Sequence, residues 1–323
     1  MQYELTTTTT TPATVTQQAE ISNVIGVFAQ QQDVKPTSRT LYQRAVTQFF
    51  DWVTASGRAI PTLTIADVIA YKDYLLRVGK STLTVGGYIN AIRRFFAWAE
   101  ANKIYPNIAK GVRAPKREQA FKKRPLSVGK VAELLRYEQE QSPRDYAIIN
   151  LMARTGLRCI EVARANIGDI TYLGANNTRV LMVQGKGRDE KDNYVVLPDA
   201  AYIPIRAYLT TRKGEPDNAP LFVSVSNHTA NGGRLTTRTI SAIAKKGLQS
   251  VGLDNKAFTA HSLRHAAATN ILRGGGTLVQ AQTCLRHANP ATTQIYANMA
   301  INERRLTNGG EMILDKLYNE AMI

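Results

Sequence analysis

Cysteine and long apolar runs are scarce in this sequence of 323 residues. Its two cysteines, Cys159 and Cys284, are too few and too far apart for a disulfide framework or a thiolate metal site, so reduced thiols are expected. No apolar run approaches the roughly 20 residues that a membrane-spanning helix needs. Residues 1–11 also lack the basic and apolar segments of a secretory signal. We therefore expect a cytoplasmic protein with no membrane partner.

Acidic residues are scarce relative to basic ones. The chain has 41 Lys and Arg against 25 Asp and Glu, which gives a formal net charge of +16 and a pI near 9.9. Residues 1–125 carry 17 basic and 8 acidic residues, and the remainder carries 24 and 17. Such a chain is expected to bind a polyanion; nucleic acid is the commonest, and an anionic membrane surface is the rival. A clamp that closes on a polyanion from two sides would have this distribution of charge.

Motifs for nucleotide and metal chemistry are also absent. The sequence holds no phosphate-binding loop of the G-x-x-x-x-G-K-[ST] type, and no cluster of Asp and Glu resembles a two-metal nuclease. His261 and His265 have the spacing of a zinc-protease motif, but the glutamate that serves as its base is missing and Arg264 would repel a dication. We predict that the protein uses no metal and no cofactor.

The chain divides into four regions. Residues 1–20, with six consecutive threonines, have no apolar period and are predicted to be a disordered tail. Residues 21–112 show apolar residues at helical spacing in four segments, with Pro36 before the second and Ser81 at the start of the last. Residues 113–124 form a basic, proline-containing linker that either follows phosphates or is a solvated hinge. Residues 125–323 make up a second domain.

The second domain is predicted to be mostly helical with a small antiparallel sheet. Helices are expected over 127–139, 142–155, 200–211, 236–251, 262–273, 277–285 and 290–299, with a short helix after Gly156 and an amphipathic helix at 312–322. Residues 179–184 and 194–197 are rich in β-branched and apolar residues and enclose a segment with glycine, which predicts a hairpin. The predicted fold class is mainly α, a helical domain followed by an α+β domain.

Five short motifs follow one another in the second domain. They are Thr155-Gly156-Leu157-Arg158-Cys159-Ile160-Glu161, Gly185-Lys186-Gly187, His261-Ser262-Leu263-Arg264-His265, Leu285-Arg286-His287, and Tyr296. In type and order they resemble the motifs of the tyrosine recombinases, the phage integrase family that includes the simple Xer and Cre type. The resemblance covers the chain from residue 21 onward. It implies a SAM-like core-binding domain at 21–112 and a catalytic domain at 125–323, which together form a C-shaped clamp on duplex DNA.

These residue types suit the cleavage of a DNA strand through a covalent intermediate. A tyrosyl phenolate can hold the broken strand, and the resemblance makes Tyr296 that nucleophile. Two guanidiniums can clamp the nonbridging oxygens of the transition state, a task that suits Arg158 and Arg264. Each of these residues could instead have an ordinary structural role. Tyr296 is one of 14 tyrosines, and Arg158 could simply pair with Glu161 on the same helical face.

The remaining motif residues are assigned to proton transfer and support. The leaving 5′ oxygen needs a proton, which Lys186 in its glycine-flanked hairpin could deliver, although turn lysines are common. The resemblance makes His261 the base that assists Tyr296 and His287 a phosphate ligand. Glu161 is expected to support the site without being catalytic. Strand cleavage of this kind should survive EDTA.

Basic residues outside the motifs are candidates for DNA contact. Phosphate contacts should dominate the affinity and make it depend on salt. Each of these residues could instead be solubilising charge. The candidates are Arg93, Arg94, Lys116, Arg117, Lys122, Lys123, Arg124, Arg238, Lys245 and Lys246.

The resemblance implies a site-specific recombinase that cleaves and rejoins duplex DNA through a 3′-phosphotyrosine and a Holliday junction. Its partners would be a double-stranded recombination site and three further copies of the chain, so we expect it to associate with the nucleoid. The apolar residues of 312–322 either dock into a neighbouring subunit or pack on their own domain. Two other functions stay open: a type IB topoisomerase-like enzyme acting on one duplex, and a non-catalytic DNA-binding accessory protein.

Overall fold

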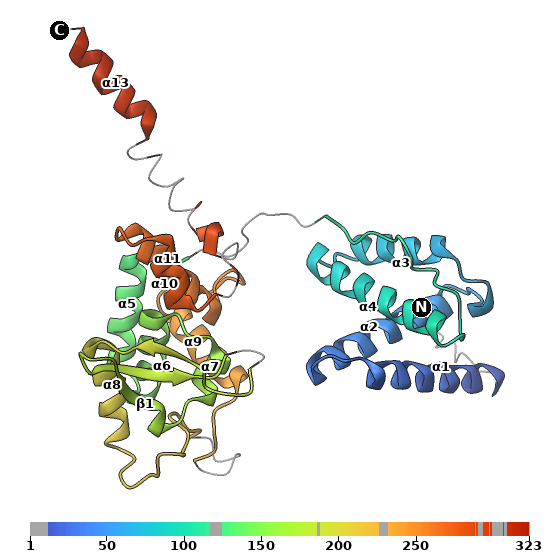
Figure 1. Cartoon of the computed structure of the whole chain (residues 1–323), viewed down its shortest axis with the longest axis horizontal. Coiled ribbons are helices and arrows are strands. Elements are labelled where there is room, and N and C mark those ends of the chain that lie inside the picture. The colour runs from blue at the N-terminus through green and yellow to red at the C-terminus, as the bar shows by residue number, and fades with distance from the viewer. Residues whose placement is uncertain are drawn as a thin grey trace, which may run out of the picture. The chain divides into compact units, whose positions relative to one another are not determined.

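The structure is a computed structural model of the whole chain (Figure 1). It describes residues 12–116, 125–185, 188–225, 232–287, 289, 293–296, 298, 306 and 309–322, with the backbone alone for 12–18. The chain forms two compact units, Met1–Ala120 and Phe121–Ile323, and the division falls within the predicted linker. In this part of the chain, no helix combines the length and the apolar character that crossing a bilayer requires.

The first unit is helical, as predicted. It contains α1 (Pro12–Gln31), α2 (Pro36–Ala55), the 3₁₀ turn η1 (Ile60–Thr62), α3 (Ile65–Arg77) and α4 (Thr82–Ala101). Helix α3 begins with a capping box in which the backbone N–H of Thr64 donates to the carboxylate of Asp67 at 2.8 Å. Helix α4 begins where expected, because the Ser81 hydroxyl accepts the backbone N–H of Thr84.

Helix α1 corrects the predicted tail. The interpretation of residues 1–20 as disordered is wrong for 12–20, because the helix begins at Pro12. Proline suits the first turn of a helix, where its missing N–H has no partner to lose. Farther along, Ile25 and Phe28 are buried and anchor the helix in the core of the unit, from which it extends towards its N-terminus. A segment without its own apolar period can therefore be helical when an anchored helix continues through it.

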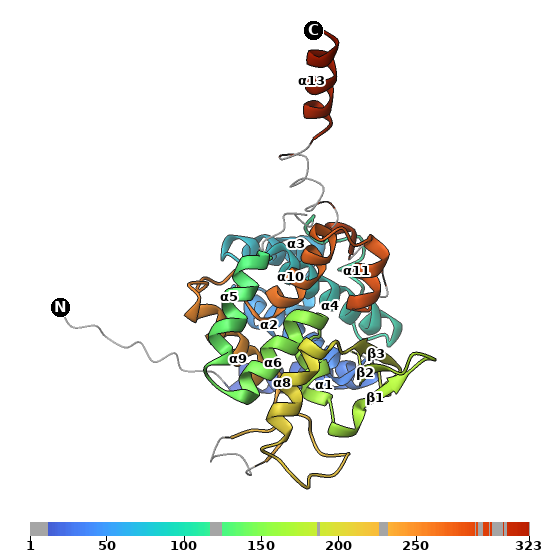
Figure 2. The same cartoon turned by 90° about the vertical axis from the view of Figure 1, so that its left-hand side faces the viewer.

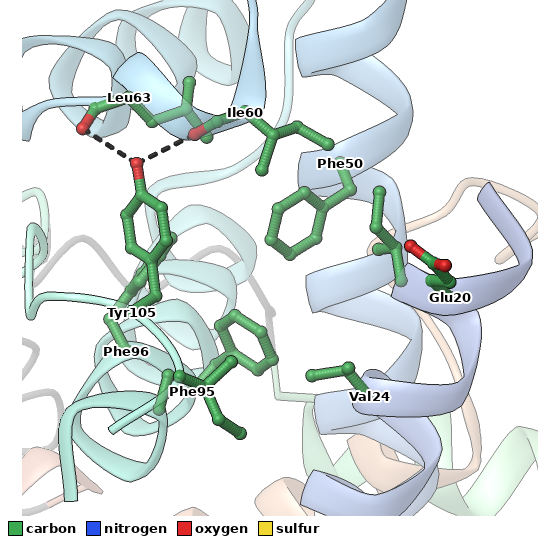
Figure 3. Close-up of a pocket in the computed structure, with 11 residues that line it drawn as sticks. Glu20, Val24, Phe50, Ile60, Leu63, Phe95, Phe96 and Tyr105 are labelled. Atoms are coloured by element: carbon green, nitrogen blue, oxygen red, sulfur yellow. Dashed lines mark hydrogen bonds between the residues drawn. The ribbon is translucent and has the colours of Figure 1, made fainter. Parts of the chain in front are cut away.

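Aromatic side chains fill the core of the first unit. Phe49 lies edge-on to Tyr71 and Phe96, with ring centroids 5.2 and 5.9 Å apart, and Phe28 meets Phe95 in the same way at 5.3 Å. Next to this core is a cavity of about 240 Å³ with a mostly apolar lining that includes Phe50 (Figure 3). The lining contains no cluster of charged or nucleophilic groups, so the chemistry has to be sought in the second unit.

The second unit is the mixed domain that the sequence predicts. Its helices are α5 (Val128–Gln139), α6 (Pro143–Thr155), α7 (Cys159–Arg164), α8 (Asp199–Leu209), α9 (Thr237–Ser250), α10 (Ala260–Arg273), α11 (Leu278–Leu285) and α13 (Gly310–Ala321). Helix α7 is the short helix predicted after Gly156, and each of the others agrees with a predicted helix to within two residues at either end. Of the helix predicted over 290–299, residues 293–296 and 298 are described, and they are helical.

A three-stranded antiparallel sheet covers part of this unit (Figure 2). The turn η2 (Ile167–Asp169) leads into β1 (Ile170–Leu173), which pairs with β2 (Thr178–Val183), and β2 pairs with β3 (Asn193–Val196). The predicted hairpin is β2 and β3, with Met182 opposite Tyr194. Strand β1 was not predicted from the sequence.

Two apolar clusters organise the second unit. The larger one joins α5 to α10 and the inner face of the sheet, and includes Leu134, Ile148, Leu181 and Leu263. The smaller one lies between α10 and α11, which run side by side in Figures 1 and 2, and it contains Tyr296. The predicted nucleophile therefore belongs to a core and not to the open surface. By contrast, α13 has no buried residue.

Candidate active site

A left-handed turn brings two of the motifs together. Helix α6 ends at Gly156, whose φ of 62° is one that residues with a Cβ rarely adopt. A Cβ added at Gly156 would lie 2.4 Å from a methyl carbon of Leu285. Glycine is therefore required here both by the backbone conformation and by the close approach of the end of α11. The turn places Arg158 at the start of α7.

The buried side chain of Arg264 links the same two segments, the turn at Gly156 and the end of α11. Its side chain is 1% exposed, donates through Nη1 to the carbonyl of Gly156 at 2.6 Å, and donates through Nη2 to the carbonyl of Leu285. Burial and the neighbouring charge of Arg158 lower the pKa of Arg264 to about 9, and Glu161 partly offsets them. The guanidinium stays charged at neutral pH. Two carbonyl contacts leave three of its five N–H groups for other acceptors.

Glu161 joins two further arginines. Its carboxylate accepts from the backbone N–H of Arg158 at 2.7 Å and from Nη1 of that residue at 2.9 Å, and it pairs with Nη2 of Arg286 at 2.9 Å. Burial raises the pKa of Glu161, but Arg286, the backbone of Arg158 and the two motif arginines outweigh it, so the net shift is downward. The carboxylate is charged and holds both guanidiniums, and the predicted ion pair of Arg158 with Glu161 is present.

His287 lies in the same positive field. Its Nδ1 shares a hydrogen bond of 2.8 Å with the Thr293 hydroxyl. Burial, followed by the charges of Arg264 and Arg158 and smaller contributions from His261 and Arg286, lowers the pKa of His287 to about 4. The imidazole is therefore neutral at physiological pH, with one donor and one acceptor nitrogen, of which Nδ1 already meets Thr293.

Tyr296 lies among these groups. Its side chain is 3% exposed, its ring is parallel to that of His287 with centroids 6.3 Å apart, and its hydroxyl is hydrogen-bonded to Nδ1 of His265. Burial raises the pKa of Tyr296 on balance, although the charges of Arg264 and Arg158 act in the opposite direction. The phenol is thus protonated at neutral pH and within the electrostatic influence of both arginines.

Of the two residues predicted to transfer protons, the structure describes His261 but not Lys186. His261 is exposed on α10, one turn before His265, with the two rings 4.5 Å apart and nearly perpendicular. Lys186 lies outside the described residues. Its neighbour Gly185 is described, and the carbonyl of Gly185 accepts from Nη1 of Arg164 on α7 at 3.2 Å. The strand that leads to Lys186 is therefore tied to the helix that Arg158 begins.

The predicted DNA-contact residues are only partly described. Arg93 and Arg94 are exposed on α4, Lys116 is exposed, and Arg238 is exposed on α9. Lys245 donates to the carbonyl of Asn255 at 3.0 Å, so it also ties α9 to the following loop. Lys246 is exposed, and its charge opposes the upward pKa shift that burial causes in Glu138. Outside the described residues lie Arg117, Lys122, Lys123 and Arg124.

Two residues of the site were not assigned a part from the sequence. Arg286 pairs with the buried Glu161, and its φ of 54° is unusual for a residue with a side chain. His265 contacts the hydroxyl of Tyr296. Both stand inside the quoted motifs, and the spacing of four residues between His261 and His265 already places their side chains on one helical face. Among the described residues, no three His, Cys, Asp or Glu side chains are grouped as a metal site would require.

Comparison with known proteins agrees with this fold and shows the family. Residues 126–303 match the phage integrase family, and residues 29–103 match the N-terminal SAM-like domain of phage integrases. The first match covers more than half of the chain. The chain belongs to the phage integrase family, as the motifs indicated.

Individual relatives give the same result. The tyrosine recombinase XerC of Pelobacter propionicus is 29% identical over 278 residues, which is 84% of this chain and 88% of the relative. The XerC of Alcanivorax borkumensis is 32% identical over 247 residues, 74% of this chain and 76% of the relative. A crystal structure of the XerH site-specific recombinase bound to its palindromic difH substrate has a TM-score of 0.70 at 18% identity, over 91% of this chain and 85% of that one. This last similarity concerns the fold.

Proposed function

We propose that the protein is a tyrosine site-specific recombinase that breaks and rejoins duplex DNA without metal or ATP. The observation that carries the proposal is the placement of the Tyr296 phenol within the electrostatic influence of Arg264 and Arg158. Positive side chains around a phenol suit an attack on a phosphodiester, because they stabilise both the phenolate and the charge that develops on phosphate. The names of the relatives, tyrosine recombinases, support the same reaction.

The proposed cleavage step balances without a cofactor. The oxygen of Tyr296 attacks the phosphorus, the bond from phosphorus to the 5′ oxygen breaks, and the strand is left as a 3′-phosphotyrosine. The phenolic proton passes to His261, and Lys186 protonates the departing 5′ oxygen. Arg158, Arg264 and the neutral His287 bind the nonbridging oxygens. The reverse attack, by a 5′ hydroxyl of a partner duplex, rejoins the strands, and two such exchanges pass through a Holliday junction.

Recombination of two duplexes requires several copies of the chain. We propose a homotetramer in which α13 docks into the neighbouring subunit. Large apolar residues on this helix, Ile313, Leu317 and Tyr318, are more than half exposed within a single chain. Exposed apolar side chains on one short helix favour a protein partner.

The decisive test is a covalent adduct. The DNA that flanks the gene is searched for inverted repeats, and a duplex built from such a repeat, nicked so that cleavage becomes irreversible, is mixed with protein and resolved on a denaturing gel. The wild type should form a protein–DNA adduct in the presence of EDTA, whereas Tyr296→Phe should form none because it lacks the nucleophilic oxygen. An adduct that persists in Tyr296→Phe would assign the chemistry to another residue. Cleavage that depends on magnesium would contradict the metal-free mechanism.

The two other functions give different outcomes in related assays. A type IB topoisomerase-like enzyme would relax a supercoiled plasmid that has no recombination site, and a non-catalytic accessory protein would bind DNA without forming an adduct. We expect relaxation only of plasmids that carry the site.

A further inference from the structure

Helix α10 presents two histidines to the site, and they occupy different environments. His261 is exposed, whereas His265, one turn later, is 8% exposed. The ring of His265 faces that of Tyr296 with centroids 5.3 Å apart, and its Nδ1 is hydrogen-bonded to the phenolic oxygen. The buried histidine, His265, therefore meets the phenol of Tyr296 directly.

The packing around Tyr296 makes its hydrogen bond to His265 important for the position of the phenol. Tyr296 packs in the small cluster between α10 and α11 with Ala268, Ala281 and Leu285, each of which offers it only apolar side-chain surface. One hydrogen bond of this kind contributes about 0.5–1.5 kcal/mol. The bond also favours one direction for the hydroxyl of this packed ring. His265 thus favours one position of the phenol.

We propose that His265 is a positioning residue that accepts the hydroxyl hydrogen of Tyr296 through Nδ1 and so fixes the nucleophile beside Arg158 and Arg264. The proposal rests on Tyr296 being the nucleophile, as argued above. In this arrangement His265 is neutral and carries its own proton on Nε2. It forms no bond to DNA and acts only through Tyr296.

Replacements at His265 separate this hydrogen bond from simple packing. His265→Leu removes the acceptor but fills similar space. His265→Asn places an amide near the position of Nδ1 and restores a polar partner. Thr269→Val is the matched control, because Thr269 is fully buried one turn later on α10 and its hydroxyl donates to the backbone carbonyl of His265.

The first measurement needs no DNA. The protein is labelled with ¹³C at the ζ carbon of tyrosine, and the NMR signal of Tyr296 is identified by its absence in Tyr296→Phe. His265→Leu should move this signal, because the ζ carbon bears the hydroxyl, while Thr269→Val should leave it in place. An unmoved signal in His265→Leu would overturn the proposal, whether or not the protein recombines DNA.

The second measurement is the single-turnover rate of adduct formation on the nicked duplex at saturating DNA. We expect His265→Leu to lower this rate about tenfold, as the loss of one hydrogen bond predicts, with DNA affinity within about twofold of the wild type. His265→Asn should recover most of the rate. A wild-type rate in His265→Leu, or no recovery in His265→Asn, would refute positioning by the hydrogen bond. If the wild type itself forms no adduct, the proposed function fails, and the NMR result identifies that case separately.

Discussion

A single buried carboxylate organises the positive charge of the site. Glu161 is 1% exposed and pairs with Arg158 and Arg286, so the two guanidiniums hold fixed positions before any phosphate arrives. Groups that are already in place do not have to be ordered during the reaction, which is the main advantage of a preorganised site. At the scale of the residue, these ion pairs suit the supporting part that the sequence predicts for Glu161.

Removing this carboxylate should be costly. Glu161→Gln leaves the buried guanidinium of Arg286 without its counter-charge, and we expect the free energy of unfolding to fall by about 3 kcal/mol. The matched control is Asp199→Asn, because Asp199 pairs with Arg179 but is largely exposed, and that change should cost less than about 1 kcal/mol. Urea unfolding followed by circular dichroism measures both. An equal loss of unfolding free energy in the two variants would show that the buried ion pairs of Glu161 stabilise the protein no more than an exposed pair does.

His287 predicts a dependence of stability on pH. Its pKa is about 4 in the folded protein and about 6.5 when unperturbed, so between these values the unfolded chain binds a proton that the folded chain does not. This residue therefore lowers the stability as pH falls from 6.5 towards 4, and its contribution levels off below that.

The slope of this dependence should be smaller in His287→Gln. Unfolding is measured by circular dichroism at several pH values. Tryptophan fluorescence is the internal control, because Trp52 and Trp98, the two tryptophans of the chain, lie in the first unit and should not respond to this replacement. An unchanged slope in the circular dichroism would mean that His287 is not held neutral.

At the scale of the element, the turn between α6 and α7 decides where Arg158 points. Gly156→Ala would meet both an unfavourable φ and the side chain of Leu285, and we expect a loss of about 3 kcal/mol. Gly252→Ala is the control, because Gly252 has a φ of 77° but open space around it, and only the backbone cost of about 1 kcal/mol should appear. Thermal or urea unfolding compares them, and a smaller loss at Gly156 than at Gly252 would be inconsistent with the tight junction.

Helix α13 should be needed for assembly and not for DNA binding. A chain truncated after Gly310 loses the exposed apolar residues Ile313, Leu317 and Tyr318 but no buried side chain. We expect its affinity for a single recombination half-site to stay within a few-fold of the wild type, while tetramers on DNA disappear in analytical ultracentrifugation. Unchanged tetramers would show that α13 is not the connector. Lys316→Ala, a polar change on the same helix, should leave assembly intact.

Among the secondary-structure elements, sequence periodicity predicted the long ones best. Helices α2, α3 and α4 follow from caps and apolar spacing, whereas β1 is only four residues long, and its partly exposed side chains give no clear alternation. It is the hydrogen-bonded pairing with β2 that makes this segment a strand. The same is true of α1 before residue 21, where an anchored helix continues through a segment without a hydrophobic face.

At the scale of the whole molecule, the excess of basic residues predicts binding that depends on salt. Both halves of the chain are basic, and exposed arginines such as Arg93 and Arg94 on α4 are candidates for phosphate contact. The logarithm of the binding constant should fall with the logarithm of salt concentration by about 0.9 per phosphate neutralised.

Replacement of both Arg93 and Arg94 by Ala should reduce that slope by about 2. Binding is measured by fluorescence anisotropy at several salt concentrations. Lys316→Ala is the control, since this lysine is exposed on α13 and is not a candidate contact, and its slope should match the wild type. If the double variant also keeps the wild-type slope, these arginines are solubilising charge.

The sequence by itself determined the basic character of the chain, its two-part organisation, most of its helices and the residue types of the site, because these depend on composition, local spacing and short motifs. Only the tertiary structure decided how the motifs meet. The partners of Arg286 and His265 come from segments 125 and 31 residues away along the chain, and the side chain of Arg264 holds a carbonyl 108 residues away. Contacts between distant segments follow from the packing of α6, α7, α10 and α11 around a left-handed glycine, which no local pattern in the sequence records.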